Sequence, residues 1–148
     1  MKVGSFRRDA RAMRDGEWVS PGPEFGEVEI KTRAMLPAYY DKLAALTARE
    51  ARRVGGENKI GMEFRNRSIV ACLVEFCLQD IRGLEHDNGE PVTFEQFVEM
   101  IGQEDYSELA TMAIVATAQV GRSRDDELSD AVGNSLPASR INSPEVVT

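Results

Sequence analysis

His86 is the residue whose side chain could most readily do chemistry, because imidazole titrates near neutral pH and binds transition metals. It is the single histidine among 148 residues, and Glu85, Asp87 and Glu90 surround it. The calcium-loop pattern fails because Glu85 stands where its first Asp should be and Gly89 replaces a ligand. A metal site would also need more converging ligands. We therefore interpret this stretch as a solvated acidic turn and expect no bound metal.

The two cysteines, Cys72 and Cys77, are the next candidates for reactive groups. They lie five residues apart in one predicted helix, about 140° around its axis, so they cannot form a disulfide with each other there. Buried, reduced thiols are the simpler interpretation.

Patterns that hold a nucleotide or activate a carboxylate are also missing from the sequence. Gly55-Gly56 leads into Asn58-Lys59-Ile60-Gly61 without the Gly-Lys-Ser/Thr ending of a phosphate-binding loop. Asp125-Asp126 falls in polar sequence that should be exposed, where altered proton affinity is not expected. We predict that the protein is not an enzyme, has no catalytic residue and uses no cofactor.

Charge is distributed unevenly along the chain, which has a formal net charge of −7. Residues 1–74 contain 14 Lys/Arg and 10 Asp/Glu, whereas residues 75–148 contain 4 and 15. This separation could draw copies of the chain together or attract the acidic half to a basic partner. The alternative is that charged helix faces serve only solubility.

Arginine is concentrated near the N-terminus, where residues 1–16 are predicted to be a basic arm, either a short helix or a mobile segment. Its arginines are Arg7, Arg8, Arg11 and Arg14. They raise the alternative of a small regulator that binds nucleic acid in a salt-dependent way. The acidity of the whole chain and the lack of interleaved aromatic residues argue against nucleic acid as the partner.

Residues 17–133 have the pattern of a single, mainly helical domain with a small N-terminal β-hairpin or sheet. Strand-like segments at residues 17–19 and 27–33 are joined by a turn containing two prolines. In the second segment, Val28 and Ile30 alternate with charged residues, which indicates one covered face. An isolated hairpin is marginal in water, so these side chains should pack on helices or on another chain.

Two helices are predicted next. Residues 36–54 form a peripheral, amphipathic helix with Pro37 in its first turn and Gly55-Gly56 at its end. The stripe expected to face the domain consists of Leu36, Tyr40, Leu43, Thr47 and Val54. Residues 64–81 are apolar around more than half of the helix, which indicates a central core helix. Gly83 would then supply a left-handed cap, with Arg82 pairing with Asp80 or bonding the last carbonyls.

The second half of the domain begins with a tight turn. Asn88-Gly89 is a favoured turn pair, so residues 84–85 and 91–92 are predicted to form a short hairpin arm. Thr93 and Gln96 match the capping box and should start a helix that runs to Ile101. Further helices are predicted at residues 106–120 and 125–132. Residues 134–148 are predicted to be a flexible tail.

The helix at residues 106–120 is predicted to carry two apolar faces. The core face consists of Leu109, Met112, Ala113, Ala116 and Val120. Ile114 and Val115 lie outside that arc, with Thr111 and Ala118 between them. Either another helix of the same chain or a partner must cover this second face. Ile114 and Val115 are therefore the candidate partner-binding residues.

The order of these parts resembles one known family. The apolar segment Ile69 to Leu78 is followed by Asp80-Ile81-Arg82-Gly83 and then by an acidic turn from Asp87 to Pro91. After the turn come a helix that begins with Phe94, a second helix, and Asn134-Ser135 near the end. Over about residues 26–139, this order is similar to that in the small tail assembly chaperones of siphophages, the long-tailed bacteriophages.

The resemblance implies a non-catalytic chaperone that works in the bacterial host cytoplasm during virion morphogenesis. Such proteins bind the tape measure protein, help to recruit the major tail tube protein, and leave before the tail is finished. The mature virion would then lack the protein, and self-association is a further option. The alternative is a virion structural protein, such as a head-tail completion or tail component. No apolar run of the sequence approaches the length of a membrane span, so a membrane partner is not expected.

Overall fold

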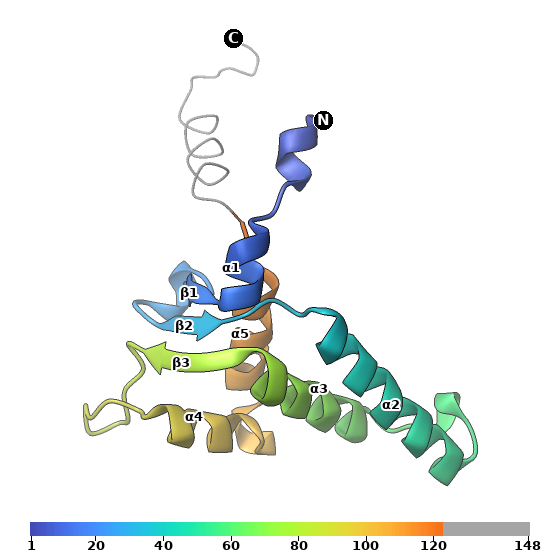
Figure 1. The fold of residues 1–148 in the computed structure, drawn as a ribbon. Coiled ribbons are helices and arrows are strands. Elements are labelled where there is room, and N and C mark those ends of the chain that lie inside the picture. The colour runs from blue at the N-terminus through green and yellow to red at the C-terminus, as the bar shows by residue number, and fades with distance from the viewer. Residues whose placement is uncertain (123–148) are drawn as a thin grey trace. The chain divides into compact units, whose positions relative to one another are not determined.

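The structure, a computed structural model, describes residues 1–122. It is mostly helical with a small three-stranded antiparallel sheet near the N-terminus, which confirms the predicted fold class (Figure 1). The chain divides into two compact units, of which the larger is Ala10–Val120 and the smaller contains Met1–Asp9 and Gly121. The helix predicted at residues 125–132 and the tail predicted at 134–148 lie outside the described residues.

The predicted basic arm of residues 1–16 is divided between the two units. A 3₁₀ turn, Val3–Phe6, belongs to the smaller unit, in which the Asp9 amide donates to the Gly121 carbonyl at 2.7 Å. The short helix α1 (Ala10–Asp15) belongs to the larger unit. It is attached there because the Ala34 amide donates to the Met13 carbonyl at 3.0 Å.

The sheet has the order β1 (Glu17–Val19), β2 (Glu29–Thr32) and β3 (Leu78–Arg82), with β2 in the centre. Ile30 lies opposite Val19 on one side and Ile81 on the other. Ile30 is fully buried, so the covered face that the alternation in β2 predicted is confirmed. The third strand was not predicted.

The predicted helix over residues 64–81 is wrong in its last part. Helix α3 (Met62–Phe76) ends before Cys77, and the chain continues as β3. The cause is a β-bulge: Lys31 lies opposite Asp80 but Thr32 lies opposite Leu78, so Gln79 is the extra residue. The bulge puts Leu78 and Ile81 on the same buried face although they are three residues apart, which is the spacing of a helix.

Helices α2 (Pro37–Val54) and α3 pack as an antiparallel hairpin that extends away from the sheet, joined through a 3₁₀ turn, Glu57–Lys59 (Figure 1). Pro37 at the start and Gly55 in the left-handed conformation at the end confirm the predicted limits of α2. The predicted stripe is wrong at Tyr40, which is 54% exposed, because Tyr39 is the ring that turns inward.

Helices α4 (Phe94–Ile101) and α5 (Ser107–Ala118) complete the larger unit. The predicted capping box of α4 is present, since Thr93 accepts from the Gln96 amide and the Gln96 side chain accepts from the Thr93 amide. The predicted short arm is present: Glu85 pairs with Pro91 in an antiparallel bridge, the Val92 amide donates to the Leu84 carbonyl at 2.9 Å, and the His86 amide donates to the Glu90 carbonyl at 2.8 Å.

Helix α5 packs against the sheet and closes the core (Figure 1). The hydroxyls of Thr32 and Thr117 are 3.2 Å apart and both are buried, which joins β2 to α5. Leu73 of α3 and Phe97 of α4 are fully buried in the same core. Nonpolar burial between these elements is therefore the main source of stability in the larger unit.

Candidate protein-interaction surfaces

Within residues 1–122, helix α5 has one covered face and one open face. Residues that face the core are fully or almost fully buried: Met112, Ala113, Ala116, Thr117. On the opposite side Val115 is 36% exposed, and Thr111 and Ala118 are exposed beside it. These three residues form the open face of α5.

The two predicted partner-binding residues do not lie in the same environment. Ile114 is partly buried and packs against the hydrophobic core, whereas Val115 belongs to the open face. A charge at position 114 would therefore disturb the core as well as any contact with a partner. Position 115 is the cleaner probe of this face.

A shallow groove lies where the turn after β3, helix α4 and the start of α5 meet. Its volume is about 240 Å³, and it is lined by Leu84, Glu85, His86, Asp87, Val92, Met100, Tyr106 and Leu109. Most of these side chains are apolar, while the carboxylates come from the turn. We call this site the acidic groove.

His86 is held in the turn by neighbouring groups. Its Nε2 atom is 2.8 Å from the Gln96 Oε1 atom, and the same oxygen accepts from the Thr93 amide. The His86 amide donates to the Glu90 carbonyl, which closes the turn. His86 thus links the turn to the cap of α4. Among residues 1–122, no group of three His, Cys, Asp or Glu side chains is arranged to hold a metal ion.

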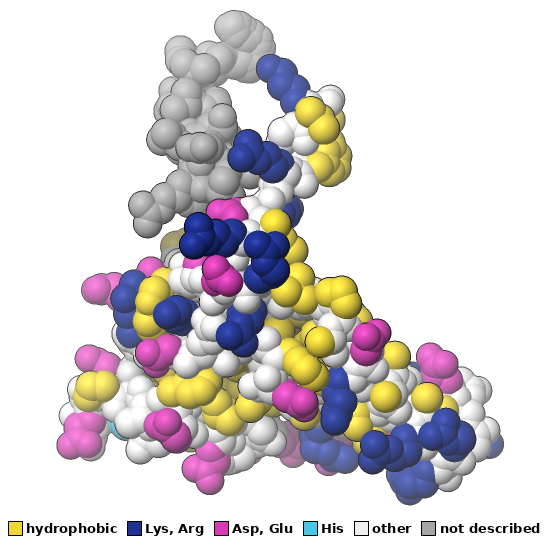
Figure 2. Space-filling model, viewed as in Figure 1, with side chains coloured by type: hydrophobic (Ala, Val, Ile, Leu, Met, Phe, Trp, Pro, Cys, Tyr) yellow, Lys and Arg dark blue, Asp and Glu magenta, His cyan; other side chains and the backbone are white. Residues whose placement is uncertain are grey.

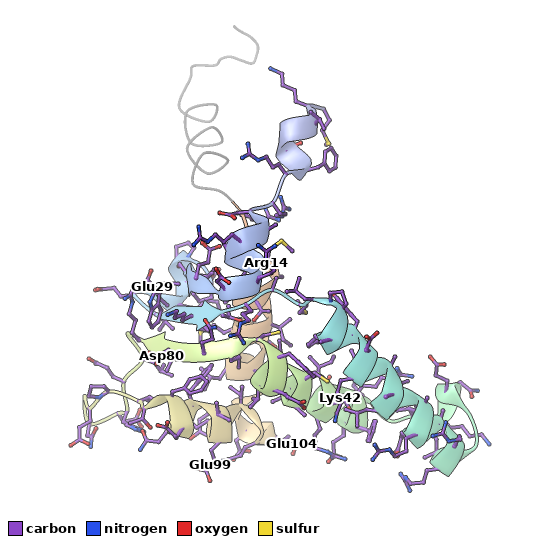
Figure 3. The ribbon with its side chains drawn as sticks, viewed as in Figure 1. Arg14, Glu29, Lys42, Asp80, Glu99 and Glu104 are labelled. Carbon is purple, nitrogen blue, oxygen red and sulfur yellow. The ribbon has the colours of Figure 1, made fainter. Side chains whose placement is uncertain are left out.

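Acidic side chains dominate the surface around this groove. Residues 83–121 contain eight Asp or Glu residues and no Lys or Arg. None of these carboxylates forms an ion pair within the part of the chain that the structure describes. Glu99 on α4 and Glu104 just beyond it project into solvent (Figure 3).

Basic side chains gather at the far end of the α2–α3 hairpin (Figure 2). Residues 49–67, which we call the distal tip, contain six Lys or Arg and three Asp or Glu. Glu50 and Glu63 are engaged within the tip by Arg53 and Arg67. Met62 is also at the tip and is 70% exposed. Met62 was not predicted as a surface residue; its position between Gly61 and Glu63, outside the apolar segment that begins at Phe64, is the sequence signal for its exposure.

The outer face of the sheet carries a different charged group, which corrects one prediction. Arg82 does not pair with Asp80 or cap a helix; its guanidinium lies 4.0 Å from the centre of the Trp18 ring and bonds the Glu29 carboxylate at 2.8 Å. Asp80 instead accepts from the Ile81 amide. The prediction was wrong because it assumed that a helix precedes Arg82, whereas β3 brings it across to β1 and β2.

The thiols of Cys72 and Cys77 lie in the core, in surroundings that make them unreactive. Cys72 and Cys77 are free and almost fully buried, and the Cys77 thiol lies 3.6 Å from the Ala34 carbonyl oxygen. Burial raises the pKa of the Cys77 thiol to about 11, and burial also raises the pKa of Cys72. A thiolate nucleophile is therefore disfavoured at both positions.

No protein-family model, curated protein or solved structure matches this chain. The likeness to tail assembly chaperones rests on the order of sequence features alone. Among the described residues, no helix is both long and apolar enough to cross a membrane.

Proposed function

We propose that this protein is a tail assembly chaperone of a siphophage, which binds the tape measure protein and helps to gather tail tube subunits around it, without catalysis. The order of sequence features from the apolar segment through the acidic turn supports the family. The structural observation that carries the binding role is the open face of α5, formed by Thr111, Val115 and Ala118.

The chemistry of this face suits a helical partner segment. Ala118 and Thr111 are small, so the backbone of a second helix can approach α5 closely, and Val115 supplies apolar area at the centre of the contact. The rest of α5 is anchored in the core through buried residues such as Ala113 and Ala116. The face is therefore presented on a rigid element, which limits the entropy lost on binding.

Co-expression with the tape measure protein tests this proposal. The chaperone should keep the tape measure protein soluble and be retained with it in a pull-down. Val115→Asp should weaken retention by about tenfold or more, because a carboxylate buried at an apolar contact has no counter-ion. Tyr40→Asp is the matched control, since Tyr40 is an exposed apolar residue on another helix and should leave retention unchanged.

Equal retention of the tape measure protein by wild type and Val115→Asp would rule out the open face of α5 as the binding site. Mass spectrometry of purified particles tests the other part of the proposal. A chaperone acts in the host cytoplasm and leaves before completion, so its peptides should be absent from finished virions. Stoichiometric peptides in virions would instead favour a structural tail or head-tail component.

A further inference from the structure

The distal tip presents an apolar side chain with basic neighbours. Met62 is the first residue of α3 and is 70% exposed. Lys59 precedes it by three residues, and Arg65 follows it by three, which places Arg65 beside Met62 on the helix surface. Lys59, Arg49 and Arg52 form no ion pair with any residue that the structure describes. Arg65 donates to the Glu57 backbone carbonyl, and Glu63, next to Met62, pairs with Arg67. The tip therefore combines an exposed apolar side chain with an excess of cations over carboxylates.

The acidic groove has the opposite character. Leu84, Val92, Met100 and Leu109 make an apolar lining, and Tyr106 is 41% exposed at its edge. Glu85 and Asp87 supply carboxylates from the turn, and both are exposed. The groove is shallow and open to solvent, with a volume of about 240 Å³, so a side chain from another molecule can reach its apolar lining. An apolar side chain flanked by cations would match both the apolar lining and the carboxylates of this groove.

From this match, we propose that copies of the chain bind one another head to tail, with Met62 of one distal tip seated in the acidic groove of the next copy. Lys59 and Arg65 then lie close to Glu85 and Asp87 of the neighbour. The occupant comes from another molecule, because the turn after β3 that lines the groove and the far end of the α2–α3 hairpin lie on opposite sides of the larger unit (Figure 1). The inference is independent of the proposed chaperone role.

This contact is heterologous, since two different surfaces of the chain meet. Each added copy offers a free tip at one end and a free groove at the other, so association continues into a row or closes into a ring. In the proposed contact, the Met62 side chain forms an apolar centre that is protected from water, and the charged pairs lie around it. Methionine suits this position because its flexible thioether adapts to an irregular groove.

Sedimentation velocity of the full-length protein tests the association. At about 0.1 M salt, where the Debye length is roughly 10 Å, the average mass should rise above the 16.4 kDa of one chain as concentration increases. At about 1 M salt the Debye length is roughly 3 Å, and the association constant should fall by roughly tenfold or more. A species of monomer mass at all concentrations up to about 1 mM in the lower salt would overturn the proposal.

Two single-surface variants distinguish this contact from any other self-association. The tip variant, Lys59→Glu with Met62→Asp, replaces the cation and the apolar side chain of the tip by carboxylates. The groove variant, Glu85→Arg with Asp87→Arg, reverses the charge of the groove. All four side chains are exposed, so folding measured by circular dichroism should be unchanged. Each variant alone should be monomeric. Mixing them restores one tip and one matching groove, so the mixture should form dimers and nothing larger.

A control variant changes exposed residues outside both surfaces. Tyr40→Asp with Glu24→Arg should associate like wild type, because Tyr40 lies in the first turns of α2 and Glu24 lies before β2. Wild-type association by either single-surface variant, or a mixture that stays monomeric, would each refute the head-to-tail contact.

Discussion

The distal tip and the layer in which α5 packs on the sheet differ in how completely their side chains are covered. In the packed layer Ile30, Thr32 and Ala113 have no exposed surface. In the tip, side chains are mostly exposed or half-buried, with Glu50 and Ile60 as the buried ones. Stability is therefore concentrated in one region of the molecule, and the other can change its surface chemistry at little cost to folding.

Truncation of a core side chain gives the largest expected effect of this difference. Leu73→Ala should lower the free energy of unfolding by about 2–5 kcal/mol, because Leu73 is fully buried and its loss leaves a cavity. Met62→Ala on the same helix should change it by less than about 0.5 kcal/mol. Urea denaturation of both variants measures the contrast, and equal midpoints would contradict the assignment of the two regions.

Substitution of a glycine in the turn after β3 should have an intermediate effect on the free energy of unfolding. Gly83 has φ of 83°, and an added Cβ would lie 2.3 Å from the Glu27 carbonyl oxygen. Gly89 has φ of 88° but nothing within 4 Å of such a Cβ. Gly89→Ala should therefore cost only the left-handed strain of about 1–2 kcal/mol, and Gly83→Ala should cost more.

Thermal unfolding of the two glycine variants measures the difference. If Gly89→Ala were the more destabilising of the two, the close approach of Gly83 to the strand end at Glu27 would be unimportant. Gly83 was predicted to adopt a left-handed conformation, but as the cap of a helix. It follows a strand instead, and the backbone of Glu27 is the second reason for glycine at this position.

The smallest effect is expected from the ion pair within the distal tip. The Nε and Nη2 atoms of Arg53 each donate to one Glu50 carboxylate oxygen at 2.7 Å, and this hydrogen bonding lowers the pKa of Glu50. A lowered folded-state pKa stabilises the fold above the unfolded value of about 4.3 and loses that contribution as pH falls further.

Glu50→Gln should therefore lower the melting temperature slightly at neutral pH, and its difference from wild type should shrink as pH falls below about 4. Glu57→Gln, at an exposed position of the same segment, is the control and should behave like wild type at both pH values. A difference that grows at acidic pH would show that the ion pair does not stabilise the tip.

The sequence predicted the helix limits that are set by residues close to each other in the chain. Thr93 and Gln96 bond each other's backbones, so four consecutive residues contain the information that starts α4. Pro37 and Gly55 act in the same way at the ends of α2. Tyr39 was missed because helical spacing alone does not decide which of two adjacent tyrosines turns toward the core.

Features that depend on distant residues could not be predicted in this way. Strand β3 exists because it pairs with β2, which lies about fifty residues earlier, and its bulge imitates helical spacing. The contact of Arg82 with Trp18 and Glu29 requires all three strands to be placed first. The acidic groove likewise forms only when the turn, α4 and α5 meet, so its lining was not recognised from the sequence.

The hydroxyl contact between Thr32 and Thr117 also determines when the protein can fold during synthesis. Thr117 is made 85 residues after Thr32, so the ribosome must produce nearly the whole larger unit before α5 can cover the sheet. Until then Ile30 and Ile81 have no apolar cover from α5, while the α2–α3 hairpin can already form from local contacts. A nascent chain that stops before Ser107 would expose the inner face of the sheet, and is therefore a target for cellular proteases.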